Sequence, residues 1–399
     1  MSVIPSAAGN SRPAIPTSGA KAPAQVIPFT RASRKKSRLV LQTAAVTLNT
    51  TVQAIPALQI PAGGFLKRLK LSVVGTTSGN SATVAFQADA PFNLLQQISL
   101  LSPNGDTLIN VIDGFSLYVI NKYGAIGTGK FDPLANPGYS AVTGAGATGG
   151  SFAYEAHIPI ETDSRDAFTA LQNMAANQSY LLQFSLNTLA LVYSTAPTTA
   201  PSVVITIVME YWAAPAPTNA DGVMQASFPV GNGSVSLLQV QTPAIVAGSQ
   251  QNIQLVNVGN VIRTVFLILR NSSAVRDETD WPTVSNWYLN NDPLYYKTKS
   301  QWRNEMAQQY GYFGGVQATP TLNSLDNGVF VLTDFMNDGG TGDWVVQGGS
   351  NRDLFLVTES STAFNYEAVS WGASASTLFV IEHVIRPISA AALYAPQFS

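Results

Sequence analysis

The chain has 399 residues, no cysteine and 11% charged residues, less than half of the roughly 25% in an average soluble protein. Its length exceeds that of one ordinary core and favours two domains. Without cysteine, a disulfide framework, thiolate metal ligands and a cysteine nucleophile are excluded. No run of 18 apolar residues occurs, so we expect no membrane-spanning helix. The low charge predicts a neutral surface or one that other subunits cover.

The chain begins with a lead rich in proline and alanine. Residues 1–25 contain four prolines and no apolar segment, which predicts a flexible arm rather than a signal peptide. Residues 1–88 hold ten basic and no acidic residues. Because the whole chain has 21 basic and 23 acidic residues, the remaining 311 carry 11 basic and 23 acidic, a balance of −12. This asymmetry indicates that one end of the molecule binds an anionic partner.

The stretch RASRKKSR, residues 31–38, supplies the candidate site residues. Four of its cations are spaced i, i+3, i+4 and i+7, so a short helix would place them on one face. Eight residues do not hold a helix alone in water, so order is expected on contact. Ala32, Phe29 and Leu39 form too small an apolar face for membrane insertion. We therefore expect electrostatic contact with anionic lipid head groups or packaged nucleic acid, through Arg31, Arg34, Lys35, Lys36 and Arg38.

The body of the chain is predicted to be mostly β-structure. Its apolar segments are rich in Val, Ile, Leu, Phe and Thr and are bounded by Gly, Asn, Ser and Pro. In chain order they are 69–75, 82–88, 94–101, 180–187, 203–212 and 261–270. Asn104-Gly105 predicts a hairpin turn. Helical pattern is sparse, and three short helices are expected, over 112–124, 162–175 and 295–311. Many short strands with few helices favour a sandwich or barrel.

Five elements recur in the same order in both halves of the chain, which indicates an internal duplication. The matches are FLKRLKLSVV with VIRTVFLILR, NKYGAIG with QQYGYFG, FAYEAHIPIE with VFVLTDFMND, YLLQFSLN with DLFLVTES, and VVITIVMEYW with TLFVIEHVI. A Pro-rich joint near residues 213–222 separates the halves. The expected division is an arm at 1–38, β-domains at 39–215 and 223–390, a linker at 216–222 and a tail at 391–399.

Residues 63–124, GGFLKRLKLSVVGTTSGNSATVAFQADAPFNLLQQISLLSPNGDTLINVIDGFSLYVINKYG, carry a family resemblance. In the order of strands, turn and helix they resemble the double jelly-roll major capsid proteins of tectiviruses and allied phages with an internal membrane, a group that shares its architecture with the adenovirus hexon. Over the rest of the chain the likeness lies in length, duplication and the basic arm. The low charge and the long Pro/Ala lead depart from the family, which leaves the subfamily and host open.

The resemblance implies an all-β fold of two eight-stranded jelly rolls in tandem, with a few short helices. It implies a structural protein without cofactor, whose homotrimers have a pseudo-hexagonal outline and tile an icosahedral shell. The implied partners are neighbouring trimers, lipids of an inner viral membrane, penton and minor capsid proteins, and the genome. The implied location is the virion, with the host cytoplasm during assembly. A virion spike or a lectin-like carbohydrate- or receptor-binding β-protein remains the alternative.

Motifs that could carry catalysis are incomplete. GAIGTGKF, residues 124–131, matches the start of a phosphate-binding loop, but Phe131 stands where Ser or Thr would bind magnesium. The only histidines, His157 and His383, lie in predicted strands without a surrounding triad or zinc motif. Asp277, Glu278 and Asp280 could be paired carboxylates or solvated loop acids. The sequence therefore predicts no enzyme and no metal site.

Two further stretches leave binding open. NDGGTGD, residues 337–343, has calcium-loop composition without a full set of ligands. Five aromatic residues cluster in the second half and could stack on sugar, although burial at a subunit boundary is favoured: Trp281, Trp287, Tyr288, Tyr295 and Tyr296.

Overall fold

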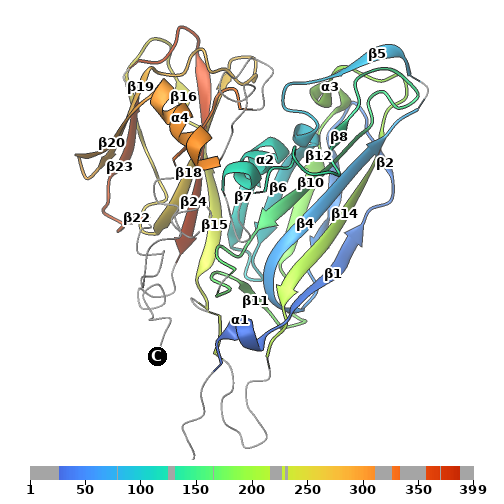
Figure 1. The fold of residues 1–399 in the computed structure, drawn as a ribbon, viewed down its shortest axis with the longest axis horizontal. Helices are drawn as coiled ribbons and strands as arrows, with labels where there is room; N and C mark the ends of the chain where they lie inside the picture. Colours follow the sequence, from blue (N-terminus) through green and yellow to red (C-terminus); the bar gives the residue numbers. More distant parts are fainter. Residues whose placement is uncertain are drawn as a thin grey trace, which may run out of the picture.

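The computed structural model is built mainly of β-strands in two halves that stand side by side (Figure 1). We call the elements from α1 to β14 the first half and those from β15 to β24 the second half. None of the described helices is long and apolar enough to cross a bilayer. The described residues are 27–78, 80–124, 131–164, 166–215, 227–229, 232–310, 326–332, 356–368 and 370–386.

The first half contains two antiparallel sheets of four main strands each. One has the order β1-β14-β4-β10 and the other the order β3-β12-β6-β7. The strands of the first sheet are β1 (Lys35–Gln42), β14 (Ser202–Trp212), β4 (Gly64–Thr76) and β10 (Phe152–Pro159). Those of the second are β3 (Gln53–Gln59), β12 (Leu181–Leu186), β6 (Leu95–Leu101) and β7 (Thr107–Ile112).

Shorter strands and helices complete the first half. β2, β8 and β11 extend the first sheet, and β13, β5 and β9 form a small separate sheet. These strands are β2 (Val46–Thr47), β5 (Asn80–Phe86), β8 (Ser140–Ala141), β9 (Gly144–Gly146), β11 (Leu171–Asn173) and β13 (Tyr193–Thr195). The helices are α1 (Phe29–Ala32), the 3₁₀ turn η1 (Phe92–Leu94), α2 (Gly114–Tyr123) and α3 (Leu189–Val192).

The second half repeats this architecture. Its sheets have the orders β15-β24-β18-β21 and β17-β23-β19-β20, so each strand has a counterpart at the same place in the first half. The first sheet consists of β15 (Val235–Gln241), β24 (Ser376–Arg386), β18 (Val261–Asn271) and β21 (Val329–Leu332). The second consists of β17 (Gln251–Gln254), β23 (Phe364–Ala368), β19 (Val284–Leu289) and β20 (Asp292–Thr298). β16 (Ala244–Ile245), β22 (Leu356–Val357) and α4 (Lys299–Tyr310) complete it.

The sheet orders confirm the fold predicted from the duplication, but one of the five matches is wrong. β12, which contains most of YLLQFSLN, lies between β3 and β6, and the strand in the equivalent place between β17 and β19 is β23. DLFLVTES instead contains β22, which pairs with β18 as β11 pairs with β4. Short apolar runs of similar composition do not reveal their strand partners, so the pattern matched the neighbouring strand.

Of the three expected helices, one is confirmed and two are corrected. α2 falls within 112–124 and begins where Asp113 Oδ1 accepts a hydrogen bond from Ser116 N at 2.6 Å. Most of 295–311 is helical, as α4, but its first four residues are not, because Asp292–Thr298 pair with β19 as strand β20. The helix over 162–175 is wrong. Ala167 and Thr169 have positive φ angles of 59° and 64°, which end any helical run, and Leu171–Asn173 form β11.

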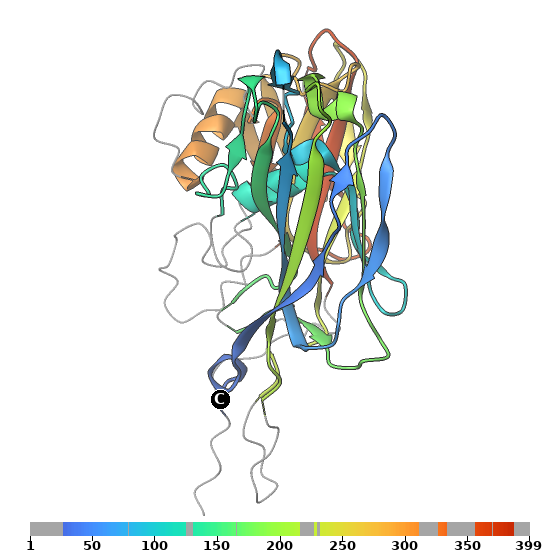
Figure 2. The ribbon, with the colours of Figure 1, turned by 90° about the vertical axis from the view of Figure 1, so that its right-hand side faces the viewer.

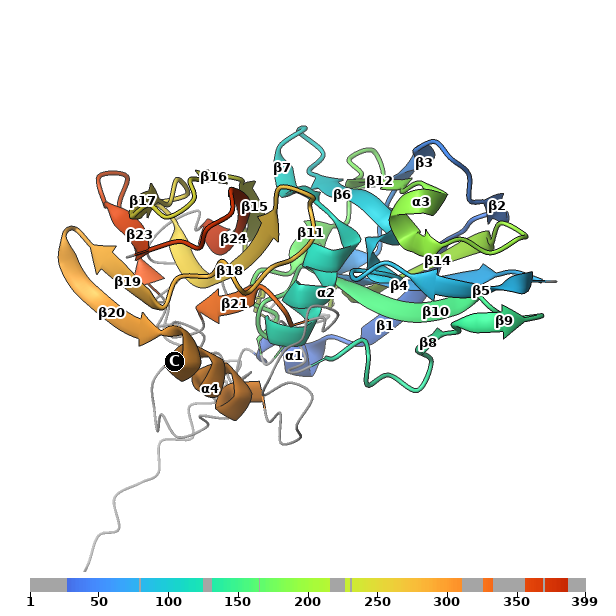
Figure 3. The ribbon, with the colours of Figure 1, turned by 90° about the horizontal axis from the view of Figure 1, so that it is seen from above.

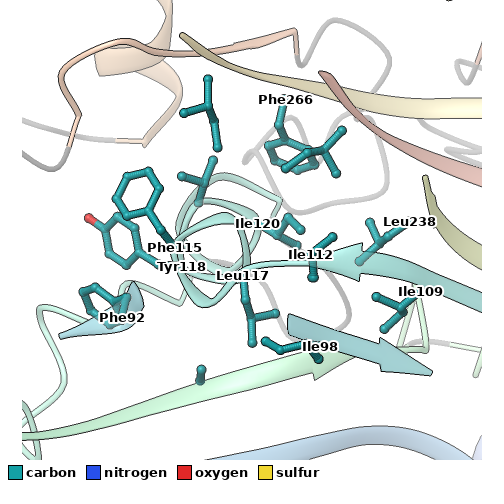
Figure 4. Packing of buried hydrophobic residues seen from close by; sticks show 14 of the residues in the cluster. Phe92, Ile98, Ile109, Ile112, Phe115, Leu117, Tyr118, Ile120, Leu238 and Phe266 are labelled. Carbon is teal, nitrogen blue, oxygen red and sulfur yellow. The ribbon is translucent and has the colours of Figure 1, made fainter. Parts of the chain in front are cut away.

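The two halves share one continuous core. β7 and β15 pair in parallel at Ile109 and Leu238, which joins a sheet of each half into one larger sheet. Figure 4 shows α2 packed between the halves, with its Leu117 turned towards Ile98 of the first half and its Ile120 on the side of Phe266 of the second half. The apolar contact therefore continues across the seam between the jelly rolls.

Buried ion pairs also cross this seam. Arg276 Nε lies 2.5 Å from Asp89 Oδ1, and Arg270 donates a hydrogen bond to the other oxygen of Asp89. Burial alone would raise the pKa of Asp89, but the two guanidinium groups outweigh it and lower this pKa. Lys122 Nζ likewise lies 2.9 Å from Asp326 Oδ1. Because each pair joins the first half to the second, the halves are fixed to one another.

Candidate functional site

The basic stretch starts at one end of the molecule, where the one-turn helix α1 is docked against the first half (Figures 1 and 2). Phe29 is 3% exposed and packs edge-to-face on Phe65, with ring centroids 5.1 Å apart. Trp212, Ala167 and Ala170 complete this small apolar cluster. The backbone N–H of Phe29 donates to Ser227 Oγ at 3.0 Å. We call this end of the molecule, around α1 and the start of β1, the base.

The candidate cations continue from α1 into an edge strand. Lys35–Arg38 form the start of β1, which pairs antiparallel with β14 from Lys35 opposite Trp212 to Arg38 opposite Met209. The expected helix over 31–38 is therefore wrong beyond Ala32, because pairing with β14 satisfies the backbone as a strand. The expected boundary of the arm at residue 38 also falls inside β1, and the fold begins by Phe29. Residues 1–26 lie outside the described part of the chain.

All five candidate residues, Arg31, Arg34, Lys35, Lys36 and Arg38, are exposed, and the structure gathers them at the base. Lys35 Nζ lies 4.8 Å from the centroid of the Trp212 ring, a cation–π contact. No carboxylate of the described residues forms an ion pair with the other four. An edge strand rich in cations resists pairing with foreign strands, and the same cations form a surface that attracts anions.

A buried ion pair supports this surface from inside. Lys67 Nζ lies 2.8 Å from Glu161 Oε1 and 2.7 Å from Ser164 Oγ, and Glu161 also accepts a hydrogen bond from Trp212 Nε1. Burial lowers the pKa of Lys67, and the Glu161 carboxylate only partly offsets this. The pair fixes the tryptophan on which Phe29 and Lys35 rest.

Further cations lie beside the site on the outer face of the same sheet. Arg68 Nε and Lys70 Nζ each lie 2.5 Å from a Glu210 oxygen. Burial would raise the pKa of Glu210, but these two cations lower it. One acid thus offsets two bases, and the excess of positive charge continues from β1 onto β4.

Both histidines are packed into the fold, and neither completes a catalytic triad among the described residues. His157 stacks on Phe131 at 4.1 Å, and burial, assisted by Arg68 and Lys70, lowers its pKa to about 3. His383 is fully buried, with Nε2 2.7 Å from Ser236 Oγ and Nδ1 3.3 Å from Arg263 Nη1. Burial, followed by the charge of Arg263, lowers the pKa of His383 far below its usual range. His383 therefore packs beside Arg263, which crosses the seam to the carbonyl oxygen of Gly124.

The loop acids do not form a catalytic pair. Glu278 Oε2 lies 2.5 Å from Arg303 Nη2, and Asp277 Oδ1 accepts from Thr279 N at 2.7 Å. Asp280 is buried next to Gly372. Within the described ranges no group of three or more His, Asp or Glu side chains is placed to hold a metal ion. Most of the phosphate-loop-like stretch and all of 337–343 lie outside the described residues.

The aromatic cluster is mainly core, and its expected burial at a subunit boundary is wrong for the two tryptophans. Trp281 and Trp287 are 3% and 0% exposed, and both pack edge-to-face on Trp302 with ring centroids 6.2 Å apart, within the second half itself. Tyr296 is 66% exposed. The two tryptophans therefore belong to the hydrophobic core of the second jelly roll.

The arrangement of two sheets in each half, repeated once along the chain, defines the double jelly-roll fold. No protein-family model matches the sequence, and no curated protein matches it. Solved structures do match. The capsid structure of Sulfolobus Turreted Icosahedral Virus has a TM-score of 0.60 at 15% identity, over 89% of this chain and 91% of that chain.

Two further similar structures come from other viruses. The PBCV-1 virus capsid model has a TM-score of 0.55 at 13% identity, over 89% of this chain and 95% of that chain. The Faustovirus major capsid protein has a TM-score of 0.53 at 10% identity, over 92% of each chain. At such low identity these likenesses establish the fold, which extends over 89–92% of this chain.

Proposed function

We propose that the protein is a major capsid protein whose homotrimers, pseudo-hexagonal in outline, tile an icosahedral virion shell. The observation that carries the proposal is the fold itself: two jelly rolls locked into one body over almost the whole length of known capsid subunits. Two similar halves in each chain give a trimer six similar walls, which suit near-hexagonal packing. The protein acts in the virion and resides in the host cytoplasm during assembly.

The base faces the particle interior in this proposal. Arg31, Arg34, Lys35, Lys36 and Arg38 contact anionic head groups of an inner membrane, as the tectivirus-like phages in the resemblance have. The position of the basic stretch supports this, because it lies at one end of the two jelly rolls and connects residues 1–26 to the first of them. Penton proteins, minor capsid proteins and neighbouring trimers complete the set of partners.

The role is structural rather than catalytic. Several buried ionisable groups of the described residues form ion pairs that stabilise the fold, such as Lys67 with Glu161 and Arg276 with Asp89. A lectin-like spike is the competing function, but its favoured sugar-stacking residues Trp281 and Trp287 are buried.

Sedimentation and electron microscopy of the purified protein test the proposal. We expect a trimer with a six-sided outline that forms sheets or shells on concentration. A stable monomer of 42.3 kDa at micromolar concentration would overturn it. So would sugar-dependent retention on a glycan resin without assembly, which is the result expected of a spike.

A further inference from the structure

The equivalent sheets of the two halves differ in what covers their outer faces. Along β4 and β14 burial alternates, and every second residue from Arg68 to Thr76 is partly or largely exposed. In β18 every residue from Val261 to Arg270 is buried, and β24 is buried continuously from Val380 to Ile385. A strand with one open face alternates, whereas a strand covered on both faces does not. The first-half sheet therefore has an open face that its counterpart lacks.

The second-half sheet is covered by the first half, and mainly by α2. Figure 3 shows α2 between the two halves, facing β18 and β24. Arg263 Nη1 donates to the carbonyl oxygen of Gly124 at 2.6 Å, at the end of α2. At the other end the Arg276 guanidinium lies 4.4 Å from the centre of the Phe115 ring. Every residue of α2 is buried.

The counterpart of α2 in the second half is α4, and α4 is covered on one side only. Each helix follows the last strand of its sheet, α2 after β7 and α4 after β20. Trp302 and Met306 of α4 are buried against its own half. The opposite side of α4 is exposed and neutral apart from one acid, with the residues Gln301, Asn304, Glu305 and Gln308.

The open face of the first-half sheet has the composition of a contact surface. Its central positions on β4 and β14 are small and uncharged, with Thr206 opposite Ser72 and Val204 opposite Val74. Charged residues flank them: Glu155 on the neighbouring strand β10, and Arg68, Lys70 and Glu210 towards the base. Leu39 and Val74 are 55% and 38% exposed. In the described part of the chain no helix lies over this face, which is turned to the viewer in Figure 1. We call this surface, formed by Leu39, Ser72, Val74, Ala153, Val204, Thr206 and Val208, the open sheet face.

We infer that the open sheet face binds the exposed side of α4 from a second copy of this chain. The contact would repeat between chains what α2 and the β18–β24 sheet do within one chain. The internal repeat supplies the argument. Within one chain, the helix of the first half covers the sheet of the second half. The equivalent helix of the second half, α4, and the equivalent sheet of the first half do not cover each other in the single chain. This inference rests on the proposed trimer and specifies which surfaces form it.

Such a contact is heterologous, since a sheet of one copy binds a helix of the next. If the rotation between chains equals the rotation between halves, the copies close into a ring instead of a fibre. Three chains then contribute six halves that each cover the next. The neutral residues at the centre of both surfaces also fit the core of a subunit interface, where charged residues are depleted, and the charged residues around them fit its polar rim.

Chemical cross-linking of introduced cysteines tests the contact. The chain has no cysteine of its own, so only the introduced thiols can react with the cross-linker. A Thr206→Cys, Asn304→Cys double variant is treated with a short bis-maleimide, and covalent products are separated by size. We expect covalent dimers and trimers. Each single variant, and the matched pair Gln183→Cys, Asn304→Cys with an exposed position on the opposite sheet, should give almost none.

A second variant measures assembly directly. Thr206→Arg should shift the sedimenting species from trimer towards monomer, while Gln183→Arg stays trimeric. Circular dichroism melting confirms that both variants are folded. If the Thr206 and Asn304 pair does not cross-link and Thr206→Arg remains trimeric, the inferred contact is wrong although the proposed trimer stands. If the unmodified protein is itself a monomer, the proposed function fails instead.

Discussion

Charged residues serve two opposite purposes at the seam between the halves and at the base. At the seam, Arg270, Arg276 and Asp89 are buried and joined by short ion pairs. At the base, Arg31, Arg34 and Lys36 lie in water without a carboxylate partner among the described residues. A chain with only 11% charged residues thus uses part of them to fix its own halves and leaves the others available to a partner.

The comparison shows why net charge alone says little about either region. A buried ion pair contributes mainly through the penalty of separating it, because the remaining charge is left in a medium of low polarity. An exposed cation contributes almost nothing to the fold, but its attraction extends to a partner over about 10 Å at 0.1 M salt. Substitutions at the seam should therefore change stability, and those at the base should change binding.

The largest effect is expected at the seam. Asp89→Ala removes the carboxylate between Arg270 and Arg276 and leaves both guanidinium groups buried without it. Breaking a buried pair in this way costs about 3–5 kcal/mol of unfolding free energy. Urea unfolding at fixed protein concentration measures the loss. Asp106→Ala, at the exposed turn between β6 and β7, is the matched control and should stay within about 0.5 kcal/mol of the wild type. Equal effects at the two positions would contradict the role of the seam.

A smaller, pH-dependent effect is expected in the strand that carries the seam. Glu382 on β24 is fully buried, and burial raises its pKa to about 7, although a hydrogen bond from Asn257 Nδ2 at 2.8 Å opposes this. Its folded pKa lies above the unfolded value of about 4.3. Its contribution to stability is therefore fully present below pH 4.3 and is lost as the pH rises through 7.

Glu382→Gln tests this sign. The variant stays uncharged, so it should unfold at a higher temperature than the wild type at pH 8 and at a similar temperature at pH 5. His383 acts in the opposite sense, because its lowered pKa removes stability as the pH falls below about 6.5. The variant should keep this acid limb of the profile. An unchanged difference between the two proteins across pH 5–8 would show that Glu382 does not titrate in that range.

The sequence predicted the fold better than it predicted the base. Apolar residues alternate along β4 and β14 and run almost continuously in β18 and β24, and both patterns follow directly from burial on a sheet, so they can be read in the sequence. RASRKKSR has no such pattern, because its strand is held by backbone pairing with β14 and its side chains are exposed. Helical spacing of its cations was therefore coincidental.

Two features of the structure had signals that sequence reasoning passed over. Arg263 and Arg270 interrupt an otherwise apolar strand, VIRTVFLILR, and charges in such a run indicate buried partners. Phe29 is the one aromatic residue near the basic stretch, and it proves to be the anchor of α1. The partners themselves, Asp89 and Trp212, are distant in sequence, so only the folded topology brings them together.

The smallest effect on the fold, and the sharpest contrast with the seam, is expected from neutralising the base. The variant Arg31→Gln, Arg34→Gln, Lys36→Gln, Arg38→Gln leaves the Lys35 contact with Trp212 intact and removes only exposed charge. Its melting temperature should match the wild type, because exposed charges contribute little to stability. Each cation near an anionic bilayer is worth about 1 kcal/mol, so flotation with phosphatidylserine vesicles should fall by orders of magnitude at low salt.

Three comparisons make the result specific to membrane contact by the base. The charge-retaining variant Arg31→Lys, Arg34→Lys, Arg38→Lys should float as the wild type does, since the attraction depends on charge rather than on guanidinium geometry. Vesicles of phosphatidylcholine alone should bind neither protein, and binding to anionic vesicles should weaken as salt rises. If the neutral variant floats like the wild type, the base does not bind lipid. If the wild type ignores the vesicles and binds duplex DNA with a steep salt dependence, the base faces the genome and the membrane contact is wrong.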